Sequence, residues 1–229
     1  MGEYITVAQG DYLAKIAQDH GFVHWETIWD APENKDLKDK RKNPNILFPG
    51  DRLFIPAKEL REESAATEKK HRFEFQADSP KLRIVLLGLK NKPLDGHECV
   101  FTVEGDSEEI KTASDGKLEK SIPPTAAQGK LLDRGKPGPQ FRTERQIPLR
   151  IGHLDPEDTL TGQIARLNNL GYNAAEQPDH ALTSDEEEKI RKSPQFLSAV
   201  EEFQCDFGLK VDGLCGPNTQ KKLTQVHGC

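Results

Sequence analysis

Long apolar runs are missing from this sequence of 229 residues. No stretch approaches the about 18 consecutive apolar residues that a membrane-spanning helix needs, so we expect no insertion into a membrane. The segment from Met1 to Val7 also lacks the basic region and apolar stretch of a secretory signal peptide. We therefore expect synthesis in the cytoplasm without a classical export signal.

Basic clusters interleaved with aromatic residues, which are typical of nucleic-acid-binding surfaces, are missing as well. The net charge is −6, so nucleic acid is not an expected partner. Apolar residues make up 34% of the chain, whereas a single large globule has about 45–50%. Because small domains have more surface per residue, this balance predicts several small domains joined by solvated linkers.

Signatures of catalysis and metal binding are scarce. No Gly-x-Ser-x-Gly elbow, P-loop or dinucleotide fingerprint occurs, and no pair of carboxylates falls in a pattern typical of a glycosidase cleft. Gly21 interrupts the helix that would carry His20 and His24, and His153-Leu154-Asp155 has no further ligands nearby. We expect no enzyme, no cofactor and no metal. An enzyme of unrecognised type stays open, because active sites are defined by geometry.

Only four cysteines are present, and none forms a Cys-x-x-Cys pair. Cys99 lies in a predicted strand, where we expect a buried and inert thiol. Two interpretations stay open for Cys205, Cys215 and Cys229, which fall in one predicted domain. They form a disulfide among themselves, or they are free thiols that pack as small apolar residues.

An acidic run extends from Asp185 to Glu188. Carboxylates are favourable at a helix N-terminus, so we interpret this run as the solvated start of a helix. It lacks the spacing around a loop that a calcium site needs.

Residues 1–57 are predicted to form one compact module with the order strand, helix, helix, strand. The first strand covers Tyr4 to Val7, and Asp11 is the expected N-cap of the first helix. Gly21 is expected to end that helix. The closing strand covers Leu53 to Ile55, after the turn signal Pro49-Gly50-Asp51.

These residues resemble the LysM family. The resemblance rests on Tyr4-x-x-Val7-x-x-Gly10-Asp11-x-Leu13-x-x-Ile16-Ala17 and Asn45-x-Leu47-x-Pro49-Gly50-x-x-Leu53-x-Ile55-Pro56. It implies binding of glycans that contain N-acetylglucosamine, in a shallow groove between two loops. Such a groove works through backbone hydrogen bonds and apolar contacts with sugar faces. The residues that the resemblance places in the groove are Gly10, Asp11, Tyr12, Leu13, Pro44, Asn45, Ile46 and Leu47.

The middle of this module departs from the family pattern. The stretch from Trp25 to Lys42 is longer than usual and carries a charged insert, residues 34–42, directly before one groove loop. Such an insert could reshape or cover the groove. The Trp-x-x-Ile-Trp-x-x-Pro-Glu-Asn segment is similar to LysM-like modules encoded near contractile injection systems, such as type VI secretion.

Residues 58–72 are predicted to be a linker, and residues 73–151 a small antiparallel β-sandwich. We expect strands at 73–75, 82–87, 98–103, 110–112, 117–122 and 146–151, with a hairpin through Ser114-Asp115-Gly116 and a loop over 133–143. Pro93-Leu94-x-Gly96 and Ser114-Asp115-Gly116 resemble motifs of transthyretin-like or carboxypeptidase-regulatory-like modules. That resemblance implies a spacer or an interaction surface.

Residues 152–229 are predicted to be helical, with Gly171 after the first helix. They resemble the peptidoglycan-binding three-helix family through Leu167-Asn168-x-Leu170-Gly171-Tyr172, Ala199-Val200-x-x-Phe203-Gln204 and Gly208-Leu209-x-Val211-Asp212-Gly213-x-x-Gly216-Pro217-x-Thr219. The motif residues that the resemblance singles out are Asp212, Gly213, Gly216 and Pro217. An acidic insert, residues 173–192, replaces the family's usual turn after the first helix.

The expected fold class is therefore multi-domain α+β, with a βααβ LysM module, a β-sandwich and a three-helix module. The expected function is non-catalytic binding of peptidoglycan, or of a related N-acetylglucosamine polymer, at the cell envelope. The alternative is an adaptor, structural component or cargo of a contractile injection apparatus, with proteins of that apparatus as partners. Export by that route would fit the missing signal peptide.

Overall fold

The computed structural model describes residues 2–58, 67–70, 79–88, 91–138, 144–178 and 180–228. The chain divides into two compact units. One comprises Met1–Ile5, Tyr12–Asp36 and Leu53–Gly152, and the other comprises Thr6–Asp11, Leu37–Arg52 and His153–Cys229. Among the described residues, every helix is too short or too polar to span a bilayer.

The first unit begins with a small α/β arrangement. Strands β1 (Glu3–Thr6) and β2 (Arg52–Ile55) form a two-stranded sheet. Between them the chain forms α1 (Leu13–Asp19), α2 (Glu26–Trp29) and the 3-10 helix η1 (Pro32–Asn34). The buried apolar residues from these elements are Leu13, Ile16, Ala17, Ile28, Trp29, Ala31, Leu53 and Ile55.

Gly21 ends α1 as predicted. Gly21 has φ +69, its N–H donates to the carbonyl of Gln18, and the N–H of Phe22 donates to the carbonyl of Ala17. These two bonds define the Schellman motif, which requires the left-handed conformation that glycine adopts without steric cost. The prediction for the start of the helix is wrong, because the N-cap is Tyr12 and not Asp11.

A buried asparagine completes the edge of β2. Asn34 is 1% exposed, and its Oδ1 accepts the N–H of Phe54 at 2.7 Å. Its Nδ2 donates to the carbonyl of Phe54 at 2.8 Å and to that of Ile28 at 2.7 Å. One side chain thus satisfies both backbone groups of Phe54, which an edge strand would otherwise leave without a partner.

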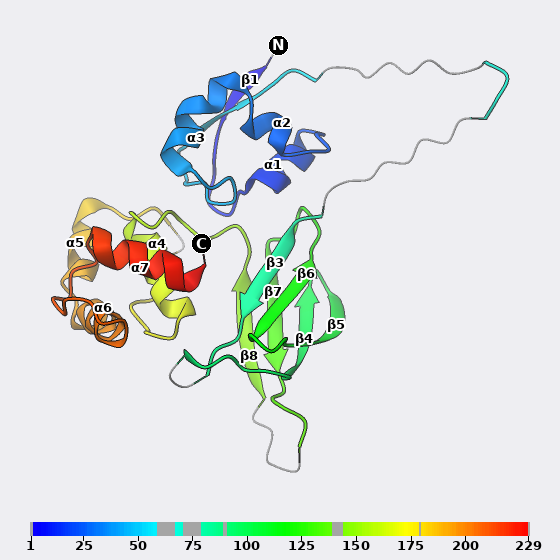
Figure 1. Ribbon diagram of the computed structural model, residues 1–229. Coiled ribbons are helices and arrows are strands. Elements are labelled where there is room, and N and C mark those ends of the chain that lie inside the picture. Colours follow the sequence, from blue (N-terminus) through cyan, green and yellow to red (C-terminus); the bar gives the residue numbers. More distant parts are fainter. Residues whose placement is uncertain are drawn as a thin grey trace. The chain divides into compact units, whose positions relative to one another are not determined.

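The rest of the first unit is a β-sandwich (Figure 1). Antiparallel strands β3 (Lys81–Val85) and β6 (Lys117–Ser121) form one layer. The other layer has the order β5-β4-β7-β8 and is antiparallel throughout, with β4 (Glu98–Val103), β5 (Asp106–Lys111), β7 (Gln128–Asp133) and β8 (Arg145–Arg150). Along β4, buried and half-buried residues alternate, as expected for a strand with one face in a core.

The pairing of the sandwich strands corrects the predicted hairpin. The Ser114-Asp115-Gly116 turn forms, but it joins β5 to β6, which lie in different layers. The hairpin partner of β5 is β4, and their register places Val103 opposite Asp106. Glu104 (φ 51) and Gly105 (φ 94) therefore form the two-residue turn, with positive φ at both positions.

Strand β7 was not predicted from the sequence. Its last residue, Asp133, is the first residue of the loop that was expected at 133–143. The strand predicted at 73–75 lies outside the described residues.

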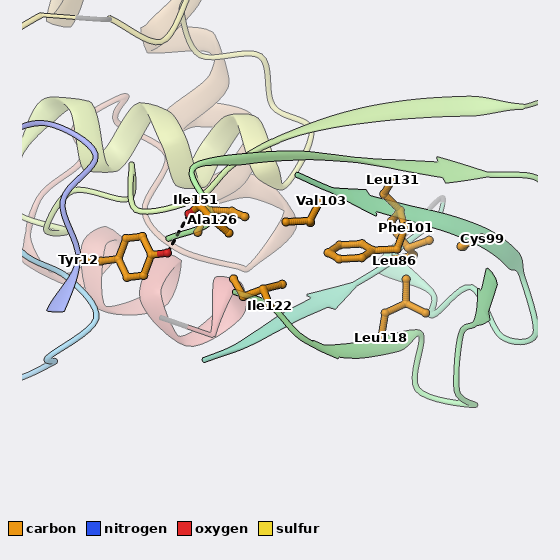
Figure 2. Packing of buried hydrophobic residues seen from close by; sticks show 10 residues of the cluster. All are labelled: Tyr12, Leu86, Cys99, Phe101, Val103, Leu118, Ile122, Ala126, Leu131 and Ile151. Carbon is orange, nitrogen blue, oxygen red and sulfur yellow. Dashed lines mark hydrogen bonds between the residues drawn. The ribbon is translucent and has the colours of Figure 1, made fainter. Parts of the chain in front are cut away.

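The sandwich core is shown in Figure 2. Phe101, Val103 and Leu131 from the larger sheet face Leu86 and Leu118, all of them at most 5% exposed. Cys99 belongs to this core as a free, buried thiol, and burial raises its pKa to about 11. The prediction of an inert thiol at this position therefore agrees with its surroundings.

The charged insert of the N-terminal module is structured. It forms a third helix, α3 (Lys35–Arg41), which the predicted strand–helix–helix–strand order did not include. Leu37 and Arg41 lie one turn apart on this helix and are both buried at the side chain, with Leu37 at 8% and Arg41 at 6% exposure. The Leu37 side chain and the aliphatic stem of Arg41 bury apolar surface on this face of α3, which explains why the insert folds.

The C-terminal part of the second unit is a helical bundle. Helices α4 (Leu160–Asn169), α6 (Pro194–Asp206) and α7 (Pro217–His227) enclose a core, and α5 (Ser184–Arg191) is an additional helix (Figure 1). The fully buried apolar residues of this core are Leu160, Ile164, Leu167, Ala174, Phe196, Ala199, Val200, Phe203 and Leu223.

The acidic run begins α5, as predicted. Thr183 is the N-cap, its Oγ1 accepts the N–H of Glu186, and the carboxylate of Glu186 accepts the N–H of Thr183. This reciprocal pair is a capping box, and the first turn carries Asp185 and Glu187 besides. Of the cysteines in this part of the chain, Cys205 and Cys215 are free thiols, and Cys229 lies outside the described residues.

Candidate functional site

The first predicted groove loop is a tight turn. The N–H of Asp11 donates to the carbonyl of Ala8 at 3.1 Å, and the N–H of Ala8 donates to Oδ2 of Asp11 at 2.9 Å. Gly10 adopts φ +84 within this turn. Asp11 therefore stabilises the turn before α1 and does not cap the helix.

The second predicted groove loop is stabilised by an ion pair that sequence reasoning missed. Arg41 donates from Nε to Oδ2 of Asp51 at 2.7 Å and from Nη2 to Oδ1 at 2.8 Å. The N–H of Phe48 donates to the same carboxylate at 3.0 Å. Both charged side chains are buried, with 6% and 4% of their surface exposed. This bidentate pair connects the end of α3 to the turn before β2.

The environment of Asp51 holds its carboxylate in the charged form. Burial alone raises the pKa of Asp51, because it disfavours the charged form. Hydrogen bonds from Arg41 and Phe48, with the charges of Arg41 and Lys40, outweigh burial and lower the pKa below its usual value. The carbonyl of Asp51 also accepts the N–H of Val7 at 2.9 Å, and the N–H of Gly50 donates to the carbonyl of Val7 at 2.9 Å. The two loops are thus joined at their bases by backbone hydrogen bonds.

Exposure differs sharply among the eight predicted groove residues. Asn45 is exposed, and Gly10, Asp11 and Pro44 are half-buried. The other four residues are buried, so in this conformation they offer little surface to a ligand. Their exposed fractions are 8% for Tyr12, 1% for Leu13, 5% for Ile46 and 5% for Leu47.

Tyr12 is buried in the core of the first unit (Figure 2). Its hydroxyl lies 2.6 Å from the carbonyl oxygen of Pro124 and 2.8 Å from that of Ala126, and it donates to them. Burial, followed by the charges of Glu104 and Asp19, raises the pKa of Tyr12 to about 12. The ring of Tyr12, which the resemblance placed in the groove, is therefore not exposed for an apolar contact with a sugar face.

In the helical module, a buried glutamine organises the motif turn. Oε1 of Gln204 accepts the N–H of Asp212 at 2.9 Å and that of Gly213 at 3.0 Å. Its Nε2 donates to Oδ1 of Asp212, the carbonyl of Leu214 and Oγ1 of Thr219, at 2.9, 3.0 and 3.1 Å. Gln204 is 1% exposed. We call this set of contacts the Gln204 cluster.

The Gln204 cluster fixes the conformation of the turn from Asp212 to Gly216. Gly213 adopts φ +68, and Asp212 accepts the N–H of Leu214 at 3.0 Å. The pKa of Asp212 is lowered by the hydrogen bond from the Gln204 side chain. The hydrogen bond from the N–H of Leu214 and the neighbouring Lys210 lower it further. The motif residues Asp212 and Gly213 therefore have a structural role in shaping the turn. Sequence reasoning quoted Gln204 within a motif but did not identify this role.

Two large apolar side chains lie exposed beside this turn. In the described part of the chain, four large apolar residues are markedly exposed, and two of them are Val211 at 54% and Leu214 at 65%. The turn thus presents apolar surface on a backbone that the Gln204 cluster holds in place.

His153 and Asp155, which were weighed as metal ligands, each have other surroundings in the described part of the chain. Asp155 is buried, and burial raises its pKa despite hydrogen bonds from Thr161 and Gln9. His153 lies against Gly10, where a Cβ would be 2.9 Å from Nε2 of His153. Across the described ranges, no three His, Cys, Asp or Glu side chains come together in a way that could hold a metal ion.

Both ends of the chain match known protein families. Residues 5–56 match the LysM domain. Residues 165–223 match the peptidoglycan binding domain. No curated protein and no solved structure matches the chain.

The two matches confirm the resemblances inferred for the N-terminal and C-terminal modules. Both families are binding domains, not catalytic ones, and their presence supports binding of cell-wall glycan at the envelope. The matches leave out residues 57–164, so the transthyretin-like resemblance of the sandwich stays a prediction. They give no support to the association with contractile injection systems.

Proposed function

We propose that this protein binds peptidoglycan without cleaving it, through its LysM module and its helical module. The observation that carries the proposal is that two separate segments, 5–56 and 165–223, each match a wall-binding family. Two weak sites on one chain raise each other's effective concentration at a polymeric surface. A chain of this kind therefore binds a repetitive wall more tightly than either module alone.

In the LysM module, the proposed contact surface is the pair of loops at Gly10–Asp11 and Pro44–Asn45. These four residues are the predicted groove residues with exposed or half-buried surface. The backbone bonds of Val7 with Gly50 and Asp51 hold the loops together at their bases, so little conformational freedom is lost when a glycan binds.

In the helical module, the proposed contact surface is the turn that carries Val211 and Leu214. Exposed apolar side chains on a fixed backbone offer contact area at low entropic cost. The Gln204 cluster keeps this turn in one conformation. Asp212, Gly213, Gly216 and Pro217 contribute by shaping the turn.

The test for the LysM loops is co-sedimentation of the full chain with insoluble peptidoglycan. Asn45→Trp places a large side chain at the exposed tip of the second loop, and Gln18→Trp places the same side chain on the exposed side of α1. We expect Asn45→Trp to reduce the bound fraction at least severalfold, and Gln18→Trp to bind as the wild type does. Equal binding by all three proteins would show that this loop does not contact the wall.

The helical module is tested in the same assay with Val211→Asp/Leu214→Asp. Both positions are exposed, so the fold tolerates the change. The matched control, Ser198→Asp/Gln225→Asp, adds the same charge at exposed helix positions. We expect the first variant to bind less peptidoglycan than the wild type. The control should bind as much as the wild type does. An equal loss of binding in both variants would mean that the added negative charge, and not the altered turn, weakens binding.

A further inference from the structure

We propose that the β-sandwich positions the first groove loop of the LysM module through Tyr12, so that glycan binding at this loop and docking of Tyr12 on the sandwich strengthen each other. The sandwich then contributes to the glycan site instead of serving only as a spacer. This inference rests on the proposed function, because it concerns how the same loop, Gly10–Asp11, is held. It is carried by the contacts of Tyr12 inside the first unit, which contains both α1 and the sandwich.

The side chain of Tyr12 is part of the sandwich core, although the residue belongs to the LysM module. Tyr12 lies in the same buried cluster as Ala126 and Ile151 (Figure 2), and Ala14 of α1 packs against this cluster as well. The hydroxyl of Tyr12 donates to the carbonyl oxygens of Pro124 and Ala126 at 2.6 and 2.8 Å. Burial raises the pKa of Tyr12 to about 12, so the phenol keeps the proton that it donates. Two residues of the LysM module therefore attach it to the sandwich.

The two acceptor carbonyls lie on a turn of the sandwich that has its own hydrogen bonds. We call residues 123–127 the acceptor turn. The N–H of Ala126 donates to the carbonyl of Pro123 at 3.0 Å, and the N–H of Ala127 donates to Oε1 of Glu104 at 3.2 Å. Since these bonds hold the acceptor turn, its carbonyls are already in place for the hydroxyl of Tyr12, and docking costs little further ordering.

Tyr12 also joins the groove loop to α1. It directly follows Asp11, whose N–H and carboxylate both bond to Ala8 within the loop turn. The carbonyl of Tyr12 accepts the N–H of Ile16 at 3.1 Å and so begins the helix. An N-cap residue usually holds the helix start with its side chain, but the Tyr12 side chain makes no capping bond. The sandwich therefore supplies the anchor that a capping side chain supplies in other helices.

This anchor keeps the junction between loop and helix in one backbone conformation. Fixing the backbone of a single residue costs a factor of roughly ten in an equilibrium constant. When Tyr12 leaves the sandwich, a glycan at Gly10–Asp11 has to fix the junction itself, so it binds roughly tenfold more weakly. Because coupling between two binding events is reciprocal, a bound glycan strengthens the docking of Tyr12 by the same factor.

The test is hydrogen exchange of the full chain, measured by NMR with and without a saturating soluble glycan, either chitotetraose or a GlcNAc–MurNAc tetrasaccharide. The amides of Ala126 and Ala127 report on the acceptor turn, and the amides of β5 are the reference within the sandwich. Tyr12→Ser removes the ring and leaves a residue that caps helices well, so α1 can still begin there. Tyr4→Ser is the matched control, because it makes the same substitution at a tyrosine that is 50% exposed.

In the wild type, we expect the glycan to slow exchange at Ala126 and Ala127 roughly tenfold and to leave the β5 amides unchanged. Tyr12→Ser should abolish this effect and weaken glycan binding, measured by calorimetric titration, by the same factor. Tyr4→Ser should change neither quantity. The exchange effect in the wild type needs no variant, so it decides the question even when Tyr12→Ser folds poorly.

Three results would overturn the coupling and leave the proposed function intact. The first is glycan binding by the wild type without slower exchange at the acceptor turn. The second is equal slowing of exchange in β5, which would mean that the glycan stabilises the whole sandwich. The third is unchanged or tighter binding by folded Tyr12→Ser. Failure of both glycans to bind the wild type would instead overturn the proposed function of the groove loop, and with it this role of Tyr12.

Discussion

Replacement of Gln204 by alanine is the most informative test of how the helical module builds its turn. The side chain accepts two backbone N–H bonds and shares its own two N–H groups among three acceptors. At most four full hydrogen bonds are lost, each worth about 1 kcal/mol net. Because the turn is at the surface, water can replace part of this loss. We therefore expect the free energy of unfolding of the module to fall by about 2–4 kcal/mol.

Gln220→Ala is the matched control. Its Nε2 donates a single hydrogen bond, to the carbonyl of Cys215 at 2.8 Å in the same turn region. We expect a loss of about 1 kcal/mol, so the two variants differ in the number of bonds and not in the residue type removed.

Urea unfolding separates the modules by two signals. Far-UV circular dichroism follows the helices, while both tryptophans, Trp25 and Trp29, lie in the N-terminal module. Gln204→Ala should shift the circular dichroism transition to much lower urea and leave the tryptophan fluorescence transition in place. A shift no larger than that of Gln220→Ala would refute the role assigned to the Gln204 cluster.

Three further predictions concern the first unit and the Arg41–Asp51 pair. Asn34→Ala removes three hydrogen bonds at β2 and should cost about 2–3 kcal/mol by tryptophan-monitored urea unfolding, so a cost below about 0.5 kcal/mol would contradict its role. Tyr12→Phe should remove an ionisation step near pH 12 from the 295 nm absorbance titration. Since burial raises the pKa of Tyr12 above its ordinary value of 10, the stability that depends on the neutral phenol should be lost between about pH 10 and 12 in the wild type, and a titration unchanged by the substitution would contradict this. The folded state lowers the pKa of Asp51, so its contribution to stability is full above about pH 4 and is lost as pH falls through the folded pKa. Stability measured from pH 6 downward should consequently fall less steeply in Asp51→Asn, and equal slopes would exclude the ion pair as a source of acid sensitivity.

Local backbone signals in the sequence predicted several features correctly. Gly21 and Gly171 end helices through the same pair of backbone bonds, because a left-handed residue is needed there and glycine supplies it cheaply. The acidic run from Asp185 to Glu188 predicted a helix start for a similarly local reason. Such features depend on neighbours within a few residues, so the sequence contains all the information they need.

The pairing of strands that lie far apart in the sequence was harder to predict. The Ser114-Asp115-Gly116 signal predicted a chain reversal but could not specify which strands pair on either side of it. The true β4–β5 turn uses Glu104 before Gly105, and glutamate is not among the residues that usually mark a turn with positive φ. Strand order in a sandwich is decided by packing in the core, not by the turn alone.

Buried polar residues and the position of Tyr12 account for what was missed at the sites. Asn34 and Gln204 read as ordinary polar residues, because the sequence does not show which backbone groups need a partner. The partners of Tyr12, Pro124 and Ala126, lie 112 and 114 residues away, so the sequence placed the ring in a groove and the structure places it in a core.

The central claim is that two modules of one chain bind peptidoglycan and leave it intact. It is tested most directly by binding isotherms on purified peptidoglycan for the wild type, Asn45→Trp, Val211→Asp/Leu214→Asp and the combination, with the supernatant analysed for released fragments. We predict that each change weakens binding, that the combination abolishes it, and that no fragments are released. Undiminished binding by the combined variant, or release of fragments by the wild type, would contradict the account.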